Sequence, residues 1–156
     1  MKRIPLTKGK EALVDDQDYD YLMQWKWYCG TNGYACRSVN GGRSVLLHRA
    51  VFGHAHGYLP RRVDHRNHNP LDCQRRNLRP ATQSQNMAHR GLDRNNTSGF
   101  KGVCFNKRRG KWLAYITAQG RRLYLGCDYD DPRVAARAYN RAALEHFGEF
   151  AVLNPV

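Results

Sequence analysis

A polar run in the second half of the chain, Asp93-Arg94-Asn95-Asn96-Thr97-Ser98-Gly99, separates two stretches with different patterns of apolar residues. Asn, Asp, Ser and Gly favour turns and loops, because their side chains or their conformational freedom stabilise backbone shapes outside helices and strands. A chain of 156 residues can hold one ordinary domain or two small ones. We therefore expect two modules, residues 1–92 and 93–156, in an α+β fold.

The stretch after this run predicts a three-stranded antiparallel sheet. Period-2 apolar patterns, which are typical of strands, occur at residues 100–106, 111–118 and 121–127. Hairpin-turn residues separate them, because Arg108-Arg109-Gly110 and Gln119-Gly120 supply the glycine that tight turns need.

One helix should follow this sheet, over residues 132–147. Asp131 can cap its N-terminus, Pro132 suits the first helical position, and Gly148 can end it. Four small residues along it would let the helix lie close to the sheet: Ala135, Ala138, Ala142 and Ala143.

Alternation along the strands sorts their side chains into two faces. The apolar face, which the helix should cover, comprises Trp112, Ala114, Ile116, Leu123 and Leu125. The opposite face comprises Leu113, Tyr115, Thr117, Arg122 and Tyr124. A sheet with one packed face and one basic, aromatic face is typical of proteins that read a DNA groove with strands.

Residues 98–156 resemble the ethylene-response-factor (AP2/ERF) type of DNA-binding domain, which also occurs fused to nucleases. The resemblance lies in the runs Gly99-Phe100-Lys101-Gly102-Val103, Gly110-Lys111-Trp112, Tyr124-Leu125-Gly126 and the alanine-rich run 135–143. With the sheet pattern, it predicts DNA contacts by Lys101, Asn106, Lys107, Arg108, Arg109, Tyr115, Thr117, Arg122 and Tyr124. The family's preference for GC-rich sites does not carry over, because Cys104, Tyr115 and Thr117 replace residues that are usually charged.

The first 60 residues predict short strands joined by turns. Residues 24–28 and 33–37 are expected to form a hairpin, with Trp25 and Trp27 on one strand face and packed in the core rather than stacked on bases. Residues 45–52 fit either a strand or a short helix.

The middle of the chain carries four polar residues that suit metal-assisted cleavage of a phosphodiester. They are the adjacent Asp64 and His65, then Asn77 within Asn77-Leu78-Arg79, and Asn86. Carboxylate and amide oxygens are ligands that Mg²⁺ accepts, and a neutral imidazole can take a proton from water near pH 7. Asn86 should lie on a helix from about residue 82 to residue 89, capped by Thr82. Taken singly, each residue would more readily be explained as a surface, capping or loop residue.

In their order and spacing, these residues resemble the HNH nuclease family in its homing-endonuclease form, with a ββα-metal core at residues 46–90. The resemblance implies that Asp64 and Asn86 bind one divalent ion, Mg²⁺ or Mn²⁺. It also implies that His65 is the general base and that Asn77 orients the His65 ring. A zinc site built from His48, His65 and His89 is the rival chemistry, and His68 is expected only to line the loop.

The formal net charge of +13 favours a polyanionic partner, and residues 61–90 carry seven basic and two acidic residues around the candidate site. There is no apolar run long enough to span a membrane and no apolar leader at the N-terminus. Five cysteines without a C-x-x-C pair argue against a disulfide framework or a common zinc site. We expect a cytoplasmic monomer, or one in the host cytoplasm if the gene is phage-encoded.

The sequence as a whole predicts a metal-dependent endonuclease that acts on double-stranded DNA, anchored by its C-terminal sheet, without a membrane or small-molecule cofactor. The alternative is a non-catalytic DNA-binding protein or transcriptional regulator with a decayed nuclease module.

Overall fold

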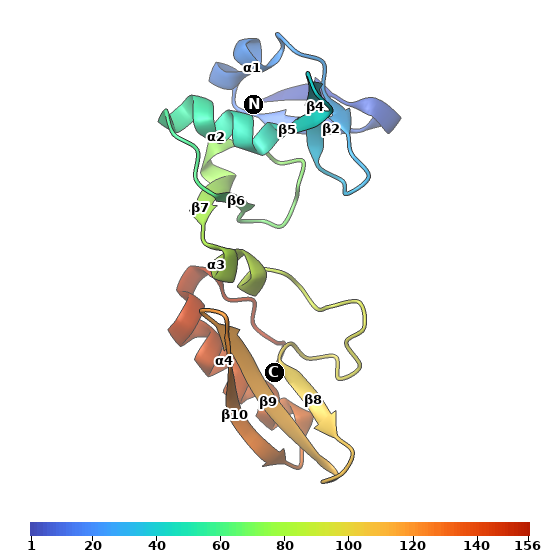
Figure 1. Cartoon of the computed structure of the whole chain (residues 1–156), viewed down its shortest axis with the longest axis vertical. Coiled ribbons are helices and arrows are strands. Elements are labelled where there is room, and N and C mark those ends of the chain that lie inside the picture. The colour runs from blue at the N-terminus through green and yellow to red at the C-terminus, as the bar shows by residue number, and fades with distance from the viewer. The chain divides into compact units, whose positions relative to one another are not determined.

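A computed structural model describes residues 1–156, and the chain divides into two compact units, Met1–Ala81 and Thr82–Val156 (Figure 1). Both contain helices and antiparallel strands, so the α+β class is confirmed. None of the helices is long and apolar enough to cross a membrane.

The first unit contains three small antiparallel sheets and two helices. Its sheets pair β1 with β2, β3 with β4 and β5, and β6 with β7. Its elements are β1 (Lys2–Pro5), the 3-10 turn η1 (Thr7–Gly9), β2 (Glu11–Val14), α1 (Asp16–Leu22), β3 (Tyr28–Cys29), β4 (Ala35–Val39), β5 (Arg43–Leu46), α2 (Leu47–His56), β6 (Arg62–His65), the 3-10 turn η2 (Arg75–Asn77) and β7 (Leu78–Ala81).

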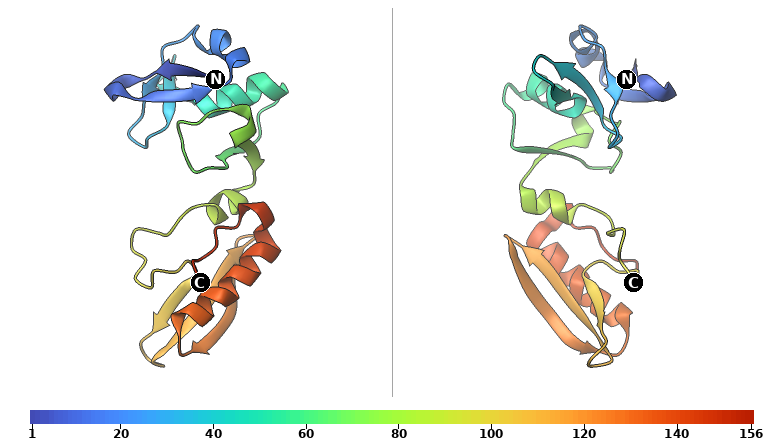
Figure 2. Two further views of the ribbon diagram at one scale, coloured as in Figure 1. Left: turned by 180° about the vertical axis from the view of Figure 1, so that it is seen from behind. Right: turned by 45° about the vertical axis from the view of Figure 1, so that its right-hand side comes forward.

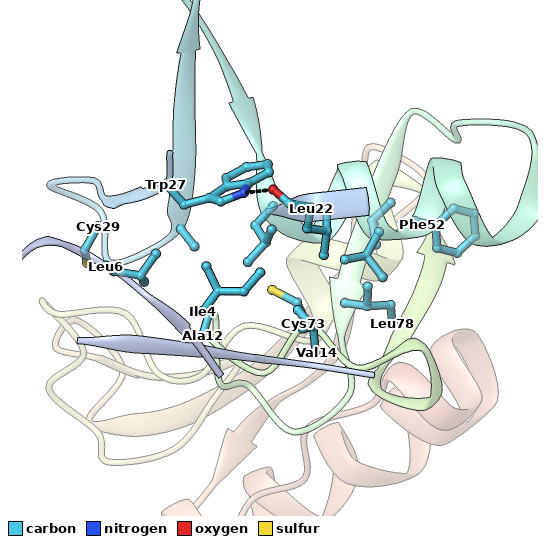
Figure 3. Packing of buried hydrophobic residues seen from close by; sticks show 14 residues of the cluster. Ile4, Leu6, Ala12, Val14, Leu22, Trp27, Cys29, Phe52, Cys73 and Leu78 are labelled. Atoms are coloured by element: carbon cyan, nitrogen blue, oxygen red, sulfur yellow. Dashed lines mark hydrogen bonds between the residues drawn. The ribbon is translucent and has the colours of Figure 1, made fainter. Parts of the chain in front are cut away.

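One apolar core joins these short elements (Figure 3). Ile4, Leu22, Leu47 and Val51 are almost completely buried in it, and they come from β1, α1 and α2. Because no sheet of this unit exceeds three strands, the core depends on residues that are far apart in the sequence.

Trp27 belongs to this core, as the sequence predicted, but the expected strand position of both tryptophans is wrong. The strand β3 begins only at Tyr28, since the chain is still turning away from α1 at Trp25, whose backbone N–H donates to Leu22 O at 3.3 Å. The indole Nε1 of Trp27 donates to the same carbonyl at 2.8 Å. Two hydrogen bonds to the end of α1 therefore fix this turn.

The structure of the first unit decides how two segments fold, residues 45–52 and the residues around Asp16. Residues 45–52, which fitted a strand or a helix, divide between both, because β5 ends at Leu46 and α2 begins at Leu47. The first 60 residues were expected to form only short strands and turns, with a helix considered only for residues 45–52, whereas Asp16 begins the helix α1. Acidic residues in a first helical turn are favoured by the helix dipole.

The second unit contains a three-stranded sheet in the order β10-β9-β8, with α4 packed on one face (Figure 2). The helix α4 (Pro132–Phe147) has the predicted bounds and the predicted cap, since the Asp131 carboxylate accepts from Arg133 N at 2.7 Å. The other elements are α3 (Gln83–Ala88), β8 (Val103–Asn106), β9 (Lys111–Ala118), β10 (Arg121–Tyr129) and the 3-10 turn η3 (Gly148–Phe150).

The predicted division of the sheet into two faces is observed on β9, where Ala114 and Ile116 are buried, whereas Leu123 of β10, expected on the covered face, is 38% exposed. Val103, Ala114 and Ala138 are buried between the sheet and α4, and small alanine side chains allow this close approach. The helix α3 is grouped with this unit, although the sequence placed it before the boundary. A capping box starts α3, because Thr82 Oγ1 accepts from Gln85 N and Gln85 Oε1 accepts from Thr82 N.

Gly102 marks the tightest approach in the second unit. It has a positive φ of 71°, and a Cβ there would lie 2.1 Å from Tyr139 Cδ2 and 2.5 Å from Tyr115 O. Its carbonyl accepts from Tyr115 N at 2.8 Å. Only glycine fits both the conformation and the space.

We predict that Gly102→Ala lowers the free energy of unfolding by about 3 kcal/mol or more, because it adds a backbone clash to an unfavourable φ. Gly110→Ala is the matched control: φ is 66° there, but no atom lies within 4 Å of the added Cβ, so the loss should be about 1 kcal/mol. Urea unfolding measures both. If both variants lose the same free energy of unfolding, the close contacts around Gly102 do not exclude a larger side chain.

Candidate functional site

The hairpin of β6 and β7 positions the first pair of predicted site residues. Asp64 and His65 are the last two residues of β6, and they lie opposite Arg79 and Leu78 of β7. Both side chains are buried, with 8% and 5% of their surfaces exposed. The strand therefore runs through both residues and ends at His65.

Asp64 is paired with Arg79 inside the hairpin. The Arg79 Nε donates to Asp64 Oδ2 at 2.9 Å, and both side chains are buried. Charge-assisted hydrogen bonds of this kind are strong and directional. The sequence alone indicates no role for Arg79, and only the strand register shows why a basic residue stands there.

His65 lies among aromatic and sulfur groups. Its ring centroid is 4.7 Å from that of His48 on α2 and 5.8 Å from that of Tyr34, and its Nε2 is 3.9 Å from Cys73 Sγ. Burial lowers the pKa of His65 to about 4, against the opposing effect of Asp64 and Asp72. The imidazole is therefore neutral at pH 7.

His48 is buried, and its ring lies against that of His65. Burial, the charge of His65 and the charge of Arg49 lower the pKa of His48 to about 3. Its Nδ1 is buried without a hydrogen-bond partner. His48 thus contacts the ring of the predicted base as a neutral group. Tyr34 and Cys73 were not identified from the sequence, because neither belongs to a recognisable pattern.

Asn77 holds the loop that leaves β6. Its Oδ1 accepts from Asn67 N at 3.0 Å, and its Nδ2 donates to Asn67 Oδ1 at 3.0 Å and to Asp72 O at 2.7 Å. Its backbone carbonyl accepts from Arg66 N at 2.8 Å. Asn77 therefore fixes the loop that begins at Arg66, directly after His65.

The turn η2, which carries Asn77, is held by two acidic residues from the N-terminal part of the chain. Asp15 Oδ2 accepts from Arg75 N at 2.8 Å. The fully buried Asp18 accepts from Arg75 Nε at 2.8 Å and from Arg75 Nη2 at 2.6 Å. Asp15 and Asp18 thus help to hold the turn that carries Asn77.

The remaining predicted residues of the site belong to other segments of the chain. Asn86 is on α3, in the second unit, and His89 ends that helix. His68 is exposed in the loop after His65, with a positive φ of 60°. No three His, Cys, Asp or Glu side chains are grouped to hold a metal ion, so the zinc alternative gains no support. Asp64 and Asn86 carry the hard oxygens that suit Mg²⁺.

The open face of the second unit's sheet brings four predicted DNA-contacting residues together. The strand register places Arg122 beside Thr117 and Tyr124 beside Tyr115. The guanidinium of Arg122 lies 4.3 Å from the centre of the Tyr115 ring, and Tyr124 is 68% exposed. This stacking holds Arg122 on the surface without an acidic partner.

Other predicted contacts have local partners. Lys101 Nζ donates to Ala88 O and Arg90 O at the end of α3, where a cation is favoured by the helix dipole. Burial lowers the pKa of Lys101 to about 8. Arg109 pairs with Asp128 at 3.1 Å.

The turn between β8 and β9 is organised by Asn106, whose Oδ1 accepts from Arg108 N and Arg109 N. Its amide is therefore engaged in the turn, whereas Lys107 and Arg108 are exposed there.

Comparison with known proteins identifies relatives of both parts. A family model described as HNH endonuclease matches residues 45–88. An uncharacterized HNH endonuclease, L560 of Acanthamoeba polyphaga mimivirus, is 31% identical over 153 residues, which are 96% of this chain and 77% of the viral protein. No solved structure matches the chain.

Two further relatives match about half of the chain. The AP2-like ethylene-responsive transcription factor TOE2 of Arabidopsis thaliana is 38% identical over 77 residues, which are 49% of this chain but only 16% of the plant protein. Protein 3.8 of Escherichia phage T7 is 35% identical over 77 residues, which are 48% of this chain and 64% of the phage protein. The chain thus covers only a small part of the plant relative.

We predict that Asn77→Ala lowers the free energy of unfolding of the first unit by about 2 kcal/mol, because it leaves Asn67 N–H and Asp72 C=O without their partner. Asn69→Ala, at an exposed position of the same loop, should cost about 1 kcal/mol or less. Urea unfolding measures both, followed by the emission of Trp25 and Trp27 in chains whose third tryptophan, Trp112 of the second unit, is replaced by phenylalanine. No loss in Asn77→Ala would contradict the proposed support of the loop.

Proposed function

Because the chain belongs to the HNH endonuclease family, we propose that it is a metal-dependent endonuclease that hydrolyses phosphodiester bonds of double-stranded DNA. The observation that carries this proposal is the adjacent Asp64 and His65 at the end of β6, inside the segment that the family model matches. The net charge of +13 suits a polyanionic substrate.

The roles follow from the chemistry of each group. We assign Asp64 and Asn86 as ligands of one Mg²⁺ or Mn²⁺ ion, which would stabilise the charge that develops on the phosphate. We assign His65 as the general base that takes a proton from the attacking water. Asn77 and His48 are positioning residues, since Asn77 fixes the loop after His65 and His48 contacts the His65 ring.

The open face of the second unit's sheet is proposed to anchor the enzyme on DNA. It presents Arg122, which can donate two parallel hydrogen bonds to a phosphate or to guanine, beside aromatic rings. The similarity to AP2-like transcription factors supports this role. A non-catalytic DNA-binding protein would share this face, and the cleavage assay distinguishes the two.

We predict that the purified protein converts supercoiled plasmid to nicked or linear DNA with Mg²⁺ or Mn²⁺, and that EDTA stops the reaction. The plasmid should carry the gene's own flanking sequence. His65→Ala should reduce the rate by about two orders of magnitude or more, since positioned proton transfer supplies that much, while DNA binding is retained. Full activity in His65→Ala would refute the assignment of the base.

The same assay tests the metal ligands. Asp64→Ala and Asn86→Ala should each raise the metal concentration for half-maximal cleavage or abolish cleavage, because each removes an oxygen ligand. His68→Ala is the control in the same loop and should change cleavage less than about two-fold. If His68→Ala is as damaging as Asp64→Ala, the proposed ligand set is wrong.

DNA anchoring is tested by equilibrium binding of the catalytically inactive His65→Ala chain. Arg122→Ala should weaken binding by about 1–3 kcal/mol if the guanidinium contacts a base. Arg133→Ala, on the exposed side of α4, removes the same charge and should have a much smaller effect. Equal losses from both variants would show that the sheet face has no special role.

A further inference from the structure

A cavity of about 480 Å³ lies in the first unit, where the edge strand β5 meets α1 and α2. Its volume is in the range of small-ligand sites, about 300–1,000 Å³. Six of its lining residues carry the argument: Tyr21, Trp25, Arg37, Arg49, Gly53 and His54. None of the residues assigned above to metal binding or catalysis lines it.

Aromatic rings form one wall of this cavity. Tyr21 and His54 stack in parallel, with centroids 4.0 Å apart and an interplanar angle of 5°. Trp25 meets Tyr21 edge to face at 5.1 Å. Such a row of rings offers a surface on which a nucleic-acid base can stack, whatever its sequence.

Positive charge forms the rest of the wall. The Arg37 guanidinium lies 4.3 Å from the Trp25 ring centre and 5.8 Å from that of Trp27, so its position is fixed by stacking and not by an acid. Arg49 donates to the carbonyls of Pro60 and Arg61, which leaves its charge without a counterion.

No carboxylate lines the cavity. The nearest acid in the network, Asp18, accepts from His54 at 2.9 Å but is fully buried and paired with Arg75. Two guanidinium groups without a facing acid favour an anionic ligand. Burial also leaves Arg37 Nε without a hydrogen-bond partner.

We propose that this cavity binds a nucleotide of the DNA substrate, with its phosphate at Arg37 and Arg49 and its base against Trp25 and Tyr21. The proposal rests on the proposed function, because the ligand is taken to be DNA. The helix α2 links the two regions: His48 contacts the ring of His65, while the next residue, Arg49, lines the cavity. DNA bound here would thus be held by the helix that packs against the catalytic histidine.

Gly53 allows a test that leaves the aromatic wall intact. It lies within α2, lines the cavity, and has no atom within 4 Å of an added Cβ. Replacing a glycine inside a helix also favours the helix. Gly53→Glu and Gly53→Lys therefore place opposite charges at one position, and Gly53→Ala is the neutral control. Gln17→Glu adds a negative charge on the exposed side of α1, outside the cavity.

The experiment uses the full chain with His65→Ala, a fluorescein-labelled duplex of mixed sequence, and fluorescence anisotropy at several salt concentrations. Gly53→Glu should weaken binding about ten-fold, whereas Gly53→Lys, Gly53→Ala and Gln17→Glu should stay within about two-fold or bind more tightly. Arg37→Gln should weaken binding about ten-fold and reduce the slope of log K against log salt by about one.

The outcomes separate the two proposals. If the His65→Ala chain binds the duplex but Gly53→Glu binds no worse than Gly53→Lys, the cavity does not contact DNA and the inference is overturned, while the proposed function stands. Equal weakening by Gly53→Glu and Gln17→Glu would overturn it too, because the effect would then be general repulsion. If the His65→Ala chain does not bind DNA even at low salt, both proposals fail.

Discussion

The buried carboxylate of Asp18 is the interaction on which the first unit depends. It lies on α1 and accepts hydrogen bonds from Arg75 on η2 and His54 on α2, so one side chain ties together three segments that are remote in the sequence. Burial opposes its ionisation, but the hydrogen bonds from Arg75 and His54 lower the pKa of Asp18. Removing one partner of such a network leaves a buried charge uncompensated, which is strongly destabilising.

This network links α1 and α2 to the candidate site, because the turn η2, which it holds through Arg75, also carries Asn77. Asn77 in turn closes the loop that begins after His65. A site that must place a carboxylate and an imidazole within a fraction of an ångström needs such support. On the other side of α2, His54 and Arg49 line the cavity that we propose for a nucleotide. The two small helices of this unit therefore contact both the residues that we propose as catalytic and the cavity that we propose for DNA.

Local sequence signals predicted the second unit well. Asp131, Pro132 and Gly148 set the ends of α4, and the period-2 pattern of β9 assigned Ala114 and Ile116 to the buried face. Thr82 and Gln85 form the capping box that begins α3. In each case a short stretch contains the whole signal, since caps, turns and alternation act between residues a few positions apart. In the first unit, α1 was missed because Asp15-Asp16 suits a turn as well as a helix start.

The sequence by itself determined the residue types of the candidate site, the charge and the order of the elements in the second unit, because these are encoded by motif spacing and local periodicity. Only the tertiary structure decided which groups meet. The pairing of Asp64 with Arg79 depends on the register of β6 and β7. The contact of His48 with His65 depends on the packing of α2. The hydrogen bond from Lys101 to the Ala88 carbonyl depends on where α3 ends. These partners stand 15, 17 and 13 positions apart, and folding brings such groups together through core packing rather than through any local pattern.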